Sequence, residues 1–251
     1  LCDDLGTALL LISHDLALAG RWCDRIAILD EGRIREESSS SMLLNQPQSE
    51  IGQRLVSAAK LREGKGQKSI PIQKTYPVIE VERLRCWHYL GSWPWQCNWL
   101  KAVDEVSFVI TRGETLGVVG ASGCGKSTLC RALIGLVPIR GGWVKLEGQD
   151  LLNLHGSQLI KTRRSIQMVF QDPLACLNPK MSIGDAIADS LLIHNLCNKS
   201  QAKEHTRELL LNVGLTPPEQ FQNRYPRELS GGQQQRVAIA RASALRPKVL
   251  I

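Results

Sequence analysis

The sequence predicts an α/β fold built on a mainly parallel sheet, and three observations indicate it. Short apolar runs that suit buried strands occur at residues 7–12, 115–119 and 166–170. Segments with helical periodicity separate these runs. A glycine-rich turn follows one of the runs and opens a helix. Strand and helix repeating in this order are typical of a parallel sheet covered by helices.

The expected elements lie on either side of a polar segment. Before it we expect strands at 7–12 and 25–29, a turn at Asp30–Arg33, a loop at 36–41 and an amphipathic helix at 42–59. Residues 60–77 are rich in Lys, Gly and Gln, which is typical of a linker. After it, the expected strands are 78–81, 102–110, 115–119, 166–170 and 249–251, and the expected helices run to about Leu136 and over 183–196, 201–213 and 232–245.

Composition and cysteine spacing exclude several classes of protein. With 43% hydrophobic and 22% charged residues, the chain is not of the disordered class, and its net charge of +7 is a modest excess. No apolar stretch reaches the roughly 18 to 20 residues that span a bilayer. Asp3 and Asp4 stand where a signal peptide would be basic, and because the first residue is Leu1 we expect the true start upstream. The eight cysteines form no C-x-x-C pair, which argues against a zinc knuckle and suits a reducing compartment.

Residues 120–128 fit the phosphate-binding pattern G-x-x-x-x-G-K-[ST] in full. Glycines let the backbone wrap around a phosphate chain, and the helix that follows offers its positive dipole end. The pattern places Lys126 at the β- and γ-phosphates and the hydroxyl of Ser127 on Mg²⁺. The predicted nucleotide-binding residues of this P-loop are Gly120, Ser122, Gly123, Cys124, Gly125, Lys126, Ser127 and Thr128. Because the match follows a predicted strand and opens a predicted helix, it indicates a nucleotide site.

A second motif, Leu-Ser-Gly-Gly-Gln-Gln-Gln-Arg at residues 229–236, indicates which kind of nucleotide-binding protein this is. Ser230 is placed as the N-cap of an apolar-periodic helix, and a helix N-terminus of this kind is an anion site. The motif resembles the signature of the ATP-binding-cassette ATPases, the motors of membrane transporters. In that family it closes over the γ-phosphate held by the opposite subunit's P-loop, which implies this role for Ser230, Gly231, Gly232 and Gln233.

The resemblance implies a more detailed fold and a set of cofactors. The fold would be a P-loop NTPase with a mainly parallel core sheet, an antiparallel β subdomain and an α-helical signature subdomain, and the cofactors would be ATP and Mg²⁺. The segment Met168–Pro173 resembles the family's Q-loop. Gln171 is therefore expected at a strand end, where it ligates Mg²⁺ or orients water and couples the site to the transmembrane partner.

An aromatic residue upstream of the P-loop stacks on adenine in this family. The candidates here are Trp87, His88 and Tyr89, of which we favour Tyr89. The alternative is that the whole tryptophan-rich insertion packs elsewhere. The tryptophans of this insertion are Trp87, Trp93, Trp95 and Trp99.

The order of the motifs departs from that of a single cassette. Lys248–Ile251 resembles the opening of the Walker B strand, which in the family precedes the switch histidine. Leu10–Asp15, at the other end of the chain, resembles the switch-histidine strand, with His14 as the histidine. The economical interpretation is a tandem protein sampled across the junction of its two cassettes, and the alternative is a natural circular permutant. In the tandem interpretation residues 1–59 close a first cassette, 60–77 are the linker and 78–251 open a second cassette.

This order leads to two expectations about the chain itself. The Asp that holds Mg²⁺ and the Glu that acts as general base should lie just past Ile251, so we expect an incomplete cassette that is inactive alone. Because the P-loop strand then has an open edge, residues 8–12 should pair in parallel with 115–119 and carry His14 towards the P-loop.

Several sequence segments resemble those of the oligopeptide, dipeptide and nickel importer branch of the family, among them residues 100–108, 170–179 and 224–230. This resemblance implies transmembrane permease subunits, a second cassette and a substrate-binding protein as partners, at the cytoplasmic face of the inner membrane. One rival is a nucleic-acid machine with cassette domains. It would show a coiled coil or zinc-binding cysteines between the P-loop and the signature. The roughly 60 residues between Gln171 and Leu229 contain neither, so no nucleic-acid partner is expected. A third interpretation is a non-catalytic fragment.

Overall fold

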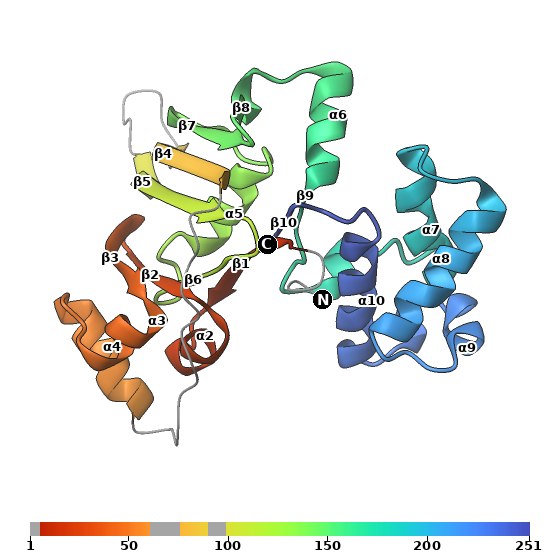
Figure 1. The fold of residues 1–251 in the computed structure, drawn as a ribbon, viewed down its shortest axis with the longest axis horizontal. Coiled ribbons are helices and arrows are strands. Elements are labelled where there is room, and N and C mark those ends of the chain that lie inside the picture. Colours follow the sequence, from red (N-terminus) through yellow and green to blue (C-terminus); the bar gives the residue numbers. More distant parts are fainter. Residues whose placement is uncertain (1–5, 61–75, 90–98) are drawn as a thin grey trace. The chain divides into compact units, whose positions relative to one another are not determined.

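A computed structural model describes residues 6–60, 76–89 and 99–251 (Figure 1). The chain forms two compact units. The first holds the described residues up to Leu159 together with Ile251, and the second holds Ile160–Leu250. The predicted linker and the middle of the tryptophan-rich insertion, including Trp93 and Trp95, lie largely outside the described residues.

The P-loop strand lies between two other strands in the first unit. The strands concerned are β1 (Ala8–Ser13), β2 (Arg25–Asp30), β3 (Arg33–Ser39) and β6 (Thr115–Val119), in the order β3-β2-β6-β1. β6 runs parallel to both of its neighbours, with Leu9 opposite Thr115 and Ser13 opposite Val119. The expected parallel pairing of residues 8–12 with 115–119 is therefore confirmed.

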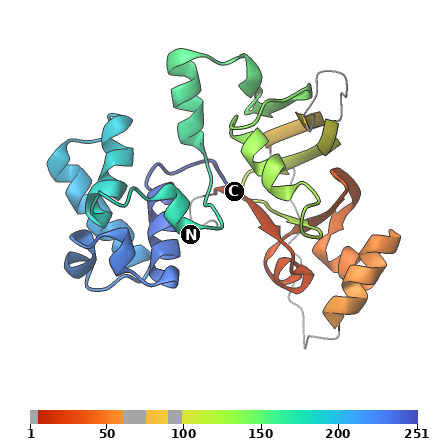
Figure 2. The same ribbon diagram turned by 180° about the vertical axis from the view of Figure 1, so that it is seen from behind.

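Three helices pack on one face of this sheet (Figures 1 and 2). They are α2 (Leu16–Trp22), α3 (Ser40–Asn45) and α4 (Glu50–Lys60). α2 begins after Asp15, whose carboxylate accepts hydrogen bonds from the N–H groups of Ala17 and Leu18 at 2.9 and 3.2 Å, as an N-cap does. The buried cluster between helices and sheet comprises Leu16, Ala19, Cys23, Ile26, Ile28, Leu43, Val56 and Val119.

Two predictions for this region are wrong. The expected loop at 36–41 is mostly strand, because β3 continues to Ser39, and the expected helix at 42–59 is divided into α3 and α4. Glu36 on β3 stabilises the start of α4, since its carboxylate accepts hydrogen bonds from the N–H groups of Gln48 and Ser49, both at 2.8 Å. Partial burial raises the pKa of Glu36, but these hydrogen bonds outweigh it, and the pKa lies below its usual value.

A second, antiparallel sheet of the first unit has the order β5-β4-β7-β8. Its strands are β4 (Pro77–Tyr89), β5 (Trp99–Thr111), β7 (Gly141–Leu146) and β8 (Gln149–Asp150). β4 and β5 are longer than predicted, and β7 and β8 were not predicted. Helix α5 (Lys126–Leu133), which follows the P-loop, packs against β4 and β5 (Figure 2).

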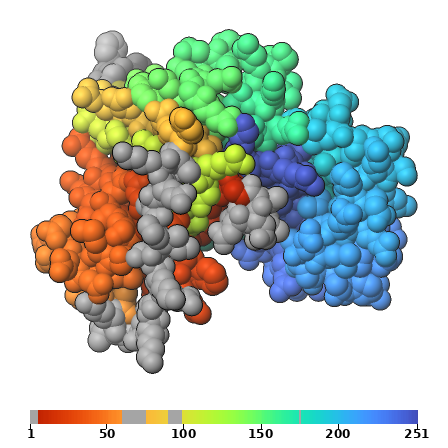
Figure 3. Space-filling model, viewed as in Figure 1, coloured from red at the N-terminus to blue at the C-terminus, as the bar shows by residue number. Residues whose placement is uncertain are grey.

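The second unit is mainly helical. Its helices are α7 (Ile183–Ile193), α8 (Lys199–Asn212), α9 (Pro218–Gln222) and α10 (Gly231–Ser243), while α6 (Gly156–Ser165) crosses the boundary between the units in sequence. Helices α7 and α8 lie at the surface of this unit (Figure 3). A parallel pair of short strands, β9 (Ile166–Gln167) and β10 (Val249–Leu250), completes it. The predicted fold class, with a parallel sheet, an antiparallel sheet and a helical part, is confirmed.

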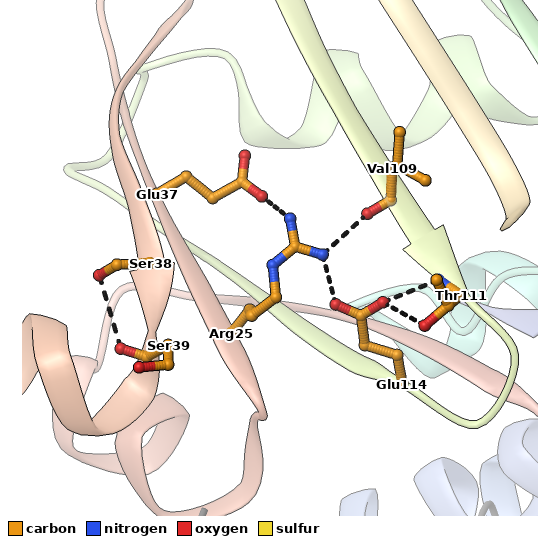
Figure 4. Close-up of polar contacts among 7 residues, drawn as sticks. All are labelled: Arg25, Glu37, Ser38, Ser39, Val109, Thr111 and Glu114. Carbon is orange, nitrogen blue, oxygen red and sulfur yellow. Dashed lines mark hydrogen bonds and ion pairs between the residues drawn. The ribbon is translucent and has the colours of Figure 1, made fainter. Parts of the chain in front are cut away.

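Arg25 on β2 joins both sheets of the first unit (Figure 4). Its guanidinium donates to the carbonyl of Val109 on β5 at 3.1 Å and to the carboxylate of Glu114 at 2.5 Å, and it also pairs with Glu37. The side chain of Glu114 is only 2% exposed. Its other carboxylate oxygen accepts from the N–H and the hydroxyl of Thr111, both at 2.7 Å. This network fixes the strand pair β2–β6 to β5.

The Arg25→Ala variant is expected to lose about 2 to 3 kcal/mol of unfolding free energy, because the buried Glu114 carboxylate loses its cation. Urea unfolding followed by circular dichroism would measure the change. The matched control is Arg54→Ala, since Arg54 and Glu50 form a pair on α4 with side chains 76% and 77% exposed. Its expected cost is below about 0.5 kcal/mol. Equal losses in the two variants would contradict the assigned role of Arg25.

Candidate functional site

The P-loop connects β6 to α5 through two glycines in left-handed backbone conformations. Gly123 has φ +81° and Gly125 has φ +106°, values that residues with a side chain rarely adopt. Gly125 is the residue before α5 and provides no side-chain cap. These two positions explain why the sequence needs glycine here.

Two of the P-loop glycines also touch backbone oxygens of other strands. A Cβ at Gly120 would lie 2.1 Å from the carbonyl oxygen of Leu29 on β2. A Cβ at Gly125 would lie 1.9 Å from the carbonyl oxygen of Ala102 on β5. Real Cβ atoms do not approach so closely, so the loop can occupy this position only with glycine at both places.

Lys126 is the first residue of α5, and its ammonium group turns back over the loop. Nζ donates to the carbonyl oxygens of Gly120 and Ala121, both at 2.7 Å, and lies 3.5 Å from the sulfur of Cys124. The cation is thereby held over the loop, and the uncapped N-terminus of α5 adds the positive end of its dipole. Lysine, glycine loop and helix end together form a site that suits a phosphate chain.

Ser127 and Thr128 lie on the first turn of α5, where Ser127 is exposed. A hydroxyl at this place suits Mg²⁺, which takes oxygen ligands and commonly keeps waters and substrate phosphates around it. In the described part of the chain, no group of three or more His, Cys, Asp or Glu side chains gathers to hold a metal ion. The exposed Ser127 hydroxyl is the group that fits a Mg²⁺ shared with nucleotide phosphates.

His14 lies at the same end of the sheet as the P-loop. It directly follows Ser13, the last residue of β1, which is paired with Val119, the last residue of β6. The exposed His14 stands between Ser13, whose hydroxyl accepts from the N–H of Asp15 at 2.9 Å, and the N-cap of α2. The carboxyl ends of neighbouring parallel strands are where α/β proteins bind ligands.

Sequence reasoning missed the turn between β2 and β3 as part of this site. Gly32 in this turn donates its N–H to the carbonyl of Cys124 at 3.0 Å, and its own carbonyl accepts from the N–H of Asp104 at 2.8 Å. Arg33 donates to the carboxylate of Asp104 from Nε at 3.1 Å and from its terminal nitrogen at 2.5 Å. Glycine followed by arginine in a tight hairpin turn was the only sequence signal, because the partners lie far away in sequence.

Asp104 is buried, and its ionised form is stabilised. Its hydrogen bonds from Arg33 lower the pKa of the carboxyl group, burial opposes this, and Lys101, with Nζ 3.8 Å away, lowers the pKa further. Because the native pKa is below the unfolded value of about 3.9, the ion pair contributes its full stability above that pH. The contribution is lost as the pH falls through the native pKa.

The Asp104→Asn variant is therefore expected to be less stable than the wild type at pH 7, and the gap should shrink below about pH 4. Denaturant unfolding between pH 3 and 7 would measure it. Glu50→Gln is the control, because Glu50 pairs with Arg54 on an exposed face and should change stability by less than about 0.5 kcal/mol. If the stability difference between wild type and Asp104→Asn grew as the pH fell, folding would not lower the pKa of Asp104 as stated.

Tyr89, the favoured adenine-stacking residue, ends β4. Its ring meets that of Trp99 edge to face, with centroids 5.4 Å apart, and the guanidinium of Arg140 lies 4.8 Å from the centroid of Trp99. Tyr89 is 48% exposed. Trp87 and His88 lie on the same strand, opposite Lys101 and Leu100. Tyr89 and Trp99 thus form an exposed aromatic pair, and adenine stacking by Tyr89 stays a prediction.

Gln171 lies in the second unit and not at a strand end. β9 stops at Gln167, earlier than the predicted strand at 166–170, and Gln171 is an exposed residue of the loop that follows. The next residue, Asp172, caps the short helix η2 (Pro173–Cys176), accepting from the N–H of Leu174 at 3.0 Å. The expectation that Gln171 ends a strand is therefore wrong. Strand β9 ends four residues earlier, and Gln171 directly precedes Asp172, the N-cap of η2.

The signature motif begins α10, as predicted. Ser230 is the N-cap, with its hydroxyl accepting from the N–H of Gln233 at 3.4 Å, and Gln233 in return accepts from the N–H of Ser230 at 3.0 Å. A Cβ at Gly231 or Gly232 would meet nothing within 4 Å, so this helix end is open. The buried Gln234, whose role the sequence did not reveal, anchors the motif by donating to two carbonyls, those of Pro226 and Leu229.

The first unit thus brings His14 beside the P-loop, whereas Gln171 and the signature residues belong to the second unit. None of the helices in the described ranges has the length and apolar character that crossing a membrane requires.

The chain is similar in sequence to known proteins. The sequence model of a family described as "ABC transporter" matches residues 103–251. The glutathione import ATP-binding protein GsiA of Pectobacterium atrosepticum is 34% identical over 278 aligned residues, covering 99% of this chain and 43% of that protein. The oligopeptide transport ATP-binding protein OppF of Salmonella typhimurium is 50% identical over 162 residues, covering 64% of this chain and 48% of that protein. The chain spans less than half the length of either relative.

Solved structures show the same fold. The ATP-binding cassette MJ0796, determined as a dimer in a post-hydrolysis state with ADP and Pi, is 29% identical with a TM-score of 0.61, over 68% of this chain and 72% of that one. CbiO1 from Clostridium perfringens, part of the transporter complex cbiONQ, is 25% identical with a TM-score of 0.55, over 69% and 64% of the two chains.

Proposed function

This chain belongs to the ABC transporter family, and from that membership we propose that it is part of an ATP-hydrolysing subunit that powers the import of peptides or a related small solute. The observation that carries the proposal is the P-loop geometry, with Lys126 held over a glycine loop at the uncapped start of α5. ATP is the nucleotide that cassette domains bind. Nickel import is the alternative within the same branch.

Different residues of the chain are proposed to contact different parts of the nucleotide. The N–H groups of the P-loop and Lys126 bind the phosphates, and Ser127 would hold Mg²⁺, which neutralises phosphate charge when bound. Gln171 as a further Mg²⁺ ligand stays a prediction from the family resemblance. His14 is proposed to sense the γ-phosphate from the strand beside the P-loop. Ser230, Gly231, Gly232 and Gln233 form a second helix-end site, which we assign to the nucleotide bound on a facing cassette.

We further propose that the chain joins parts of two cassettes, residues 1–59 from a first and 78–251 from a second, with the linker 60–77 between them. The support is that GsiA aligns with 99% of this chain in one match, so that relative contains both parts in the same order. β1, which we propose as the switch-histidine strand, precedes the P-loop in sequence, and this order supports the same proposal.

The proposed substrate and partners rest on the two named relatives, one an oligopeptide transporter component and the other a glutathione importer component. Both substrates are peptides. We propose transmembrane permease subunits, a facing cassette and a substrate-binding protein as partners, with the assembly at the cytoplasmic face of the inner membrane. No role for nucleic acid is proposed.

Nucleotide titration of the chain tests the phosphate site. Isothermal titration with MgATP, MgADP and AMP is expected to show binding of the first two and much weaker binding of AMP, which lacks the β-phosphate that Lys126 contacts. Equal affinity for AMP would overturn the assignment. The substrate is tested by disrupting the gene and measuring uptake of labelled dipeptides, oligopeptides and Ni²⁺. Unchanged peptide uptake would contradict peptide import.

A further inference from the structure

We propose that the turn between β2 and β3, residues Asp30–Arg33, is a positioning element that holds the P-loop open for phosphate. The inference rests on the proposed nucleotide site and assigns a role to residues outside the P-loop motif. Glu31 and Gly32 have φ values of +46° and +75°, so this is a two-residue hairpin turn in which both central residues are left-handed. Glycine is favoured at the second of these positions for that reason alone.

Contacts with the P-loop give Gly32 a second role. Its N–H donates to the carbonyl of Cys124 at 3.0 Å. In a helix extended by two residues, that carbonyl would instead accept from an N–H in the first turn of α5. Within the described residues it accepts from Gly32, while α5 begins only at Lys126 after the left-handed Gly125. By occupying the Cys124 carbonyl, the turn keeps that carbonyl from accepting a hydrogen bond from the first turn of α5. The N–H groups at the start of α5 therefore remain available to a phosphate.

The turn and the P-loop also enclose one carbonyl group between them. The carbonyl oxygen of Ala102 would lie 2.8 Å from a Cβ at Gly32 and 1.9 Å from a Cβ at Gly125. Two glycines therefore approach the same oxygen, one from the turn and one from the P-loop. Because no side chain separates them, a shift of the turn is transmitted to the loop through backbone atoms alone.

Asp104 and Arg33 fix the turn in this place. The N–H of Asp104 donates to the carbonyl of Gly32 at 2.8 Å, and the carboxylate accepts two hydrogen bonds from Arg33. Asp104 is 5% exposed, so the ion pair is anchored on a buried carboxylate of β5. Strand β2, which leads into the turn, is paired with the P-loop strand β6. The turn is therefore held beside the P-loop by β2 on one side and by the pair of Arg33 with Asp104 on the other.

The test compares Gly32→Ala with Gly113→Ala. Gly113 has φ +72°, close to the +75° of Gly32, but a Cβ there would meet nothing within 4 Å. Both variants should have similar backbone strain, and only Gly32→Ala should displace the turn. We expect Gly32→Ala to weaken MgADP binding by about tenfold to a hundredfold, the value of one lost hydrogen bond to a charged phosphate, with Gly113→Ala within about twofold of wild type. Equal affinities for the two variants would overturn the proposal.

A second pair of measurements keeps the proposal testable if Gly32→Ala does not fold. Arg33→Ala leaves the backbone unstrained and should weaken MgADP binding several-fold, with Arg33→Lys recovering most of the loss. Hydrogen–deuterium exchange of the peptide that contains Gly32 should slow when MgADP binds, because coupling between two sites is reciprocal. Unchanged exchange together with wild-type affinity of Arg33→Ala would refute the coupling. Loss of binding in Lys126→Ala, measured alongside, shows whether the nucleotide site itself is correctly assigned.

Discussion

Replacing Lys126 by alanine is expected to abolish nucleotide turnover in the whole protein and to weaken MgATP binding by the chain about a hundredfold. The ammonium group lies over the loop, 2.7 Å from two of its carbonyl oxygens, where it would meet the β- and γ-phosphates. Hydrogen bonds to charged groups contribute about 1.5 to 3 kcal/mol each, and loss of one electrostatic donor to a transition state typically costs about 10²–10³ in rate. Titration calorimetry and phosphate-release assays measure the two effects.

Lys145→Ala is the matched control for this variant. Lys145 lies on β7 with its ammonium group 4.2 Å from the ring centroid of Trp143, so its removal changes the net charge equally without touching the P-loop. Its affinity for MgATP should equal that of the wild type. Turnover close to wild type in Lys126→Ala would mean that the P-loop has been assigned the wrong role.

The parts of the site that were predictable are those encoded by neighbouring residues. The P-loop strand is Thr115–Val119 as expected, and Ser230 caps α10 as expected, because strand, glycine turn and N-cap each depend on a few adjacent residues. The pairing of β1 with β6 was also predicted, from the edge that the motif order leaves open. Local chemistry and topology were enough for these features.

The parts that were missed depend on contacts between distant residues. Residues 36–41 were expected to be a loop, but β3 continues to Ser39, and Glu36 and Glu37 on it are held by the N–H groups just before α4 and by Arg25. The pairing of Arg33 with Asp104 likewise joins residues far apart in sequence. Gln171 was placed at a strand end because the apolar run continues past Gln167, while backbone pairing stops there. No single-sequence pattern reports such long-range partners.

The Gly125→Ala variant is expected to be the most damaging glycine substitution in the P-loop. Alanine at φ +106° is strained, and left-handed backbone costs a residue with a side chain about 1 to 2 kcal/mol. The new Cβ would also lie 1.9 Å from the carbonyl oxygen of Ala102, a backbone atom of β5 that cannot rotate away. Forcing extra atoms into a packed region adds about 1 to 3 kcal/mol. The total of roughly 2 to 5 kcal/mol is a large share of the 5 to 15 kcal/mol that stabilises a typical domain.

Gly123→Ala separates the two causes of this loss. Gly123 is also left-handed, at φ +81°, but a Cβ there would meet nothing within 4 Å. It should therefore show only the backbone strain of about 1 to 2 kcal/mol. Thermal unfolding of the two variants, followed by circular dichroism, measures the difference. We expect a clearly lower melting temperature for Gly125→Ala than for Gly123→Ala, because only the former pushes the start of α5 away from β5. Equal melting temperatures would mean that the close contact between Gly125 and Ala102 does not hold the loop in place.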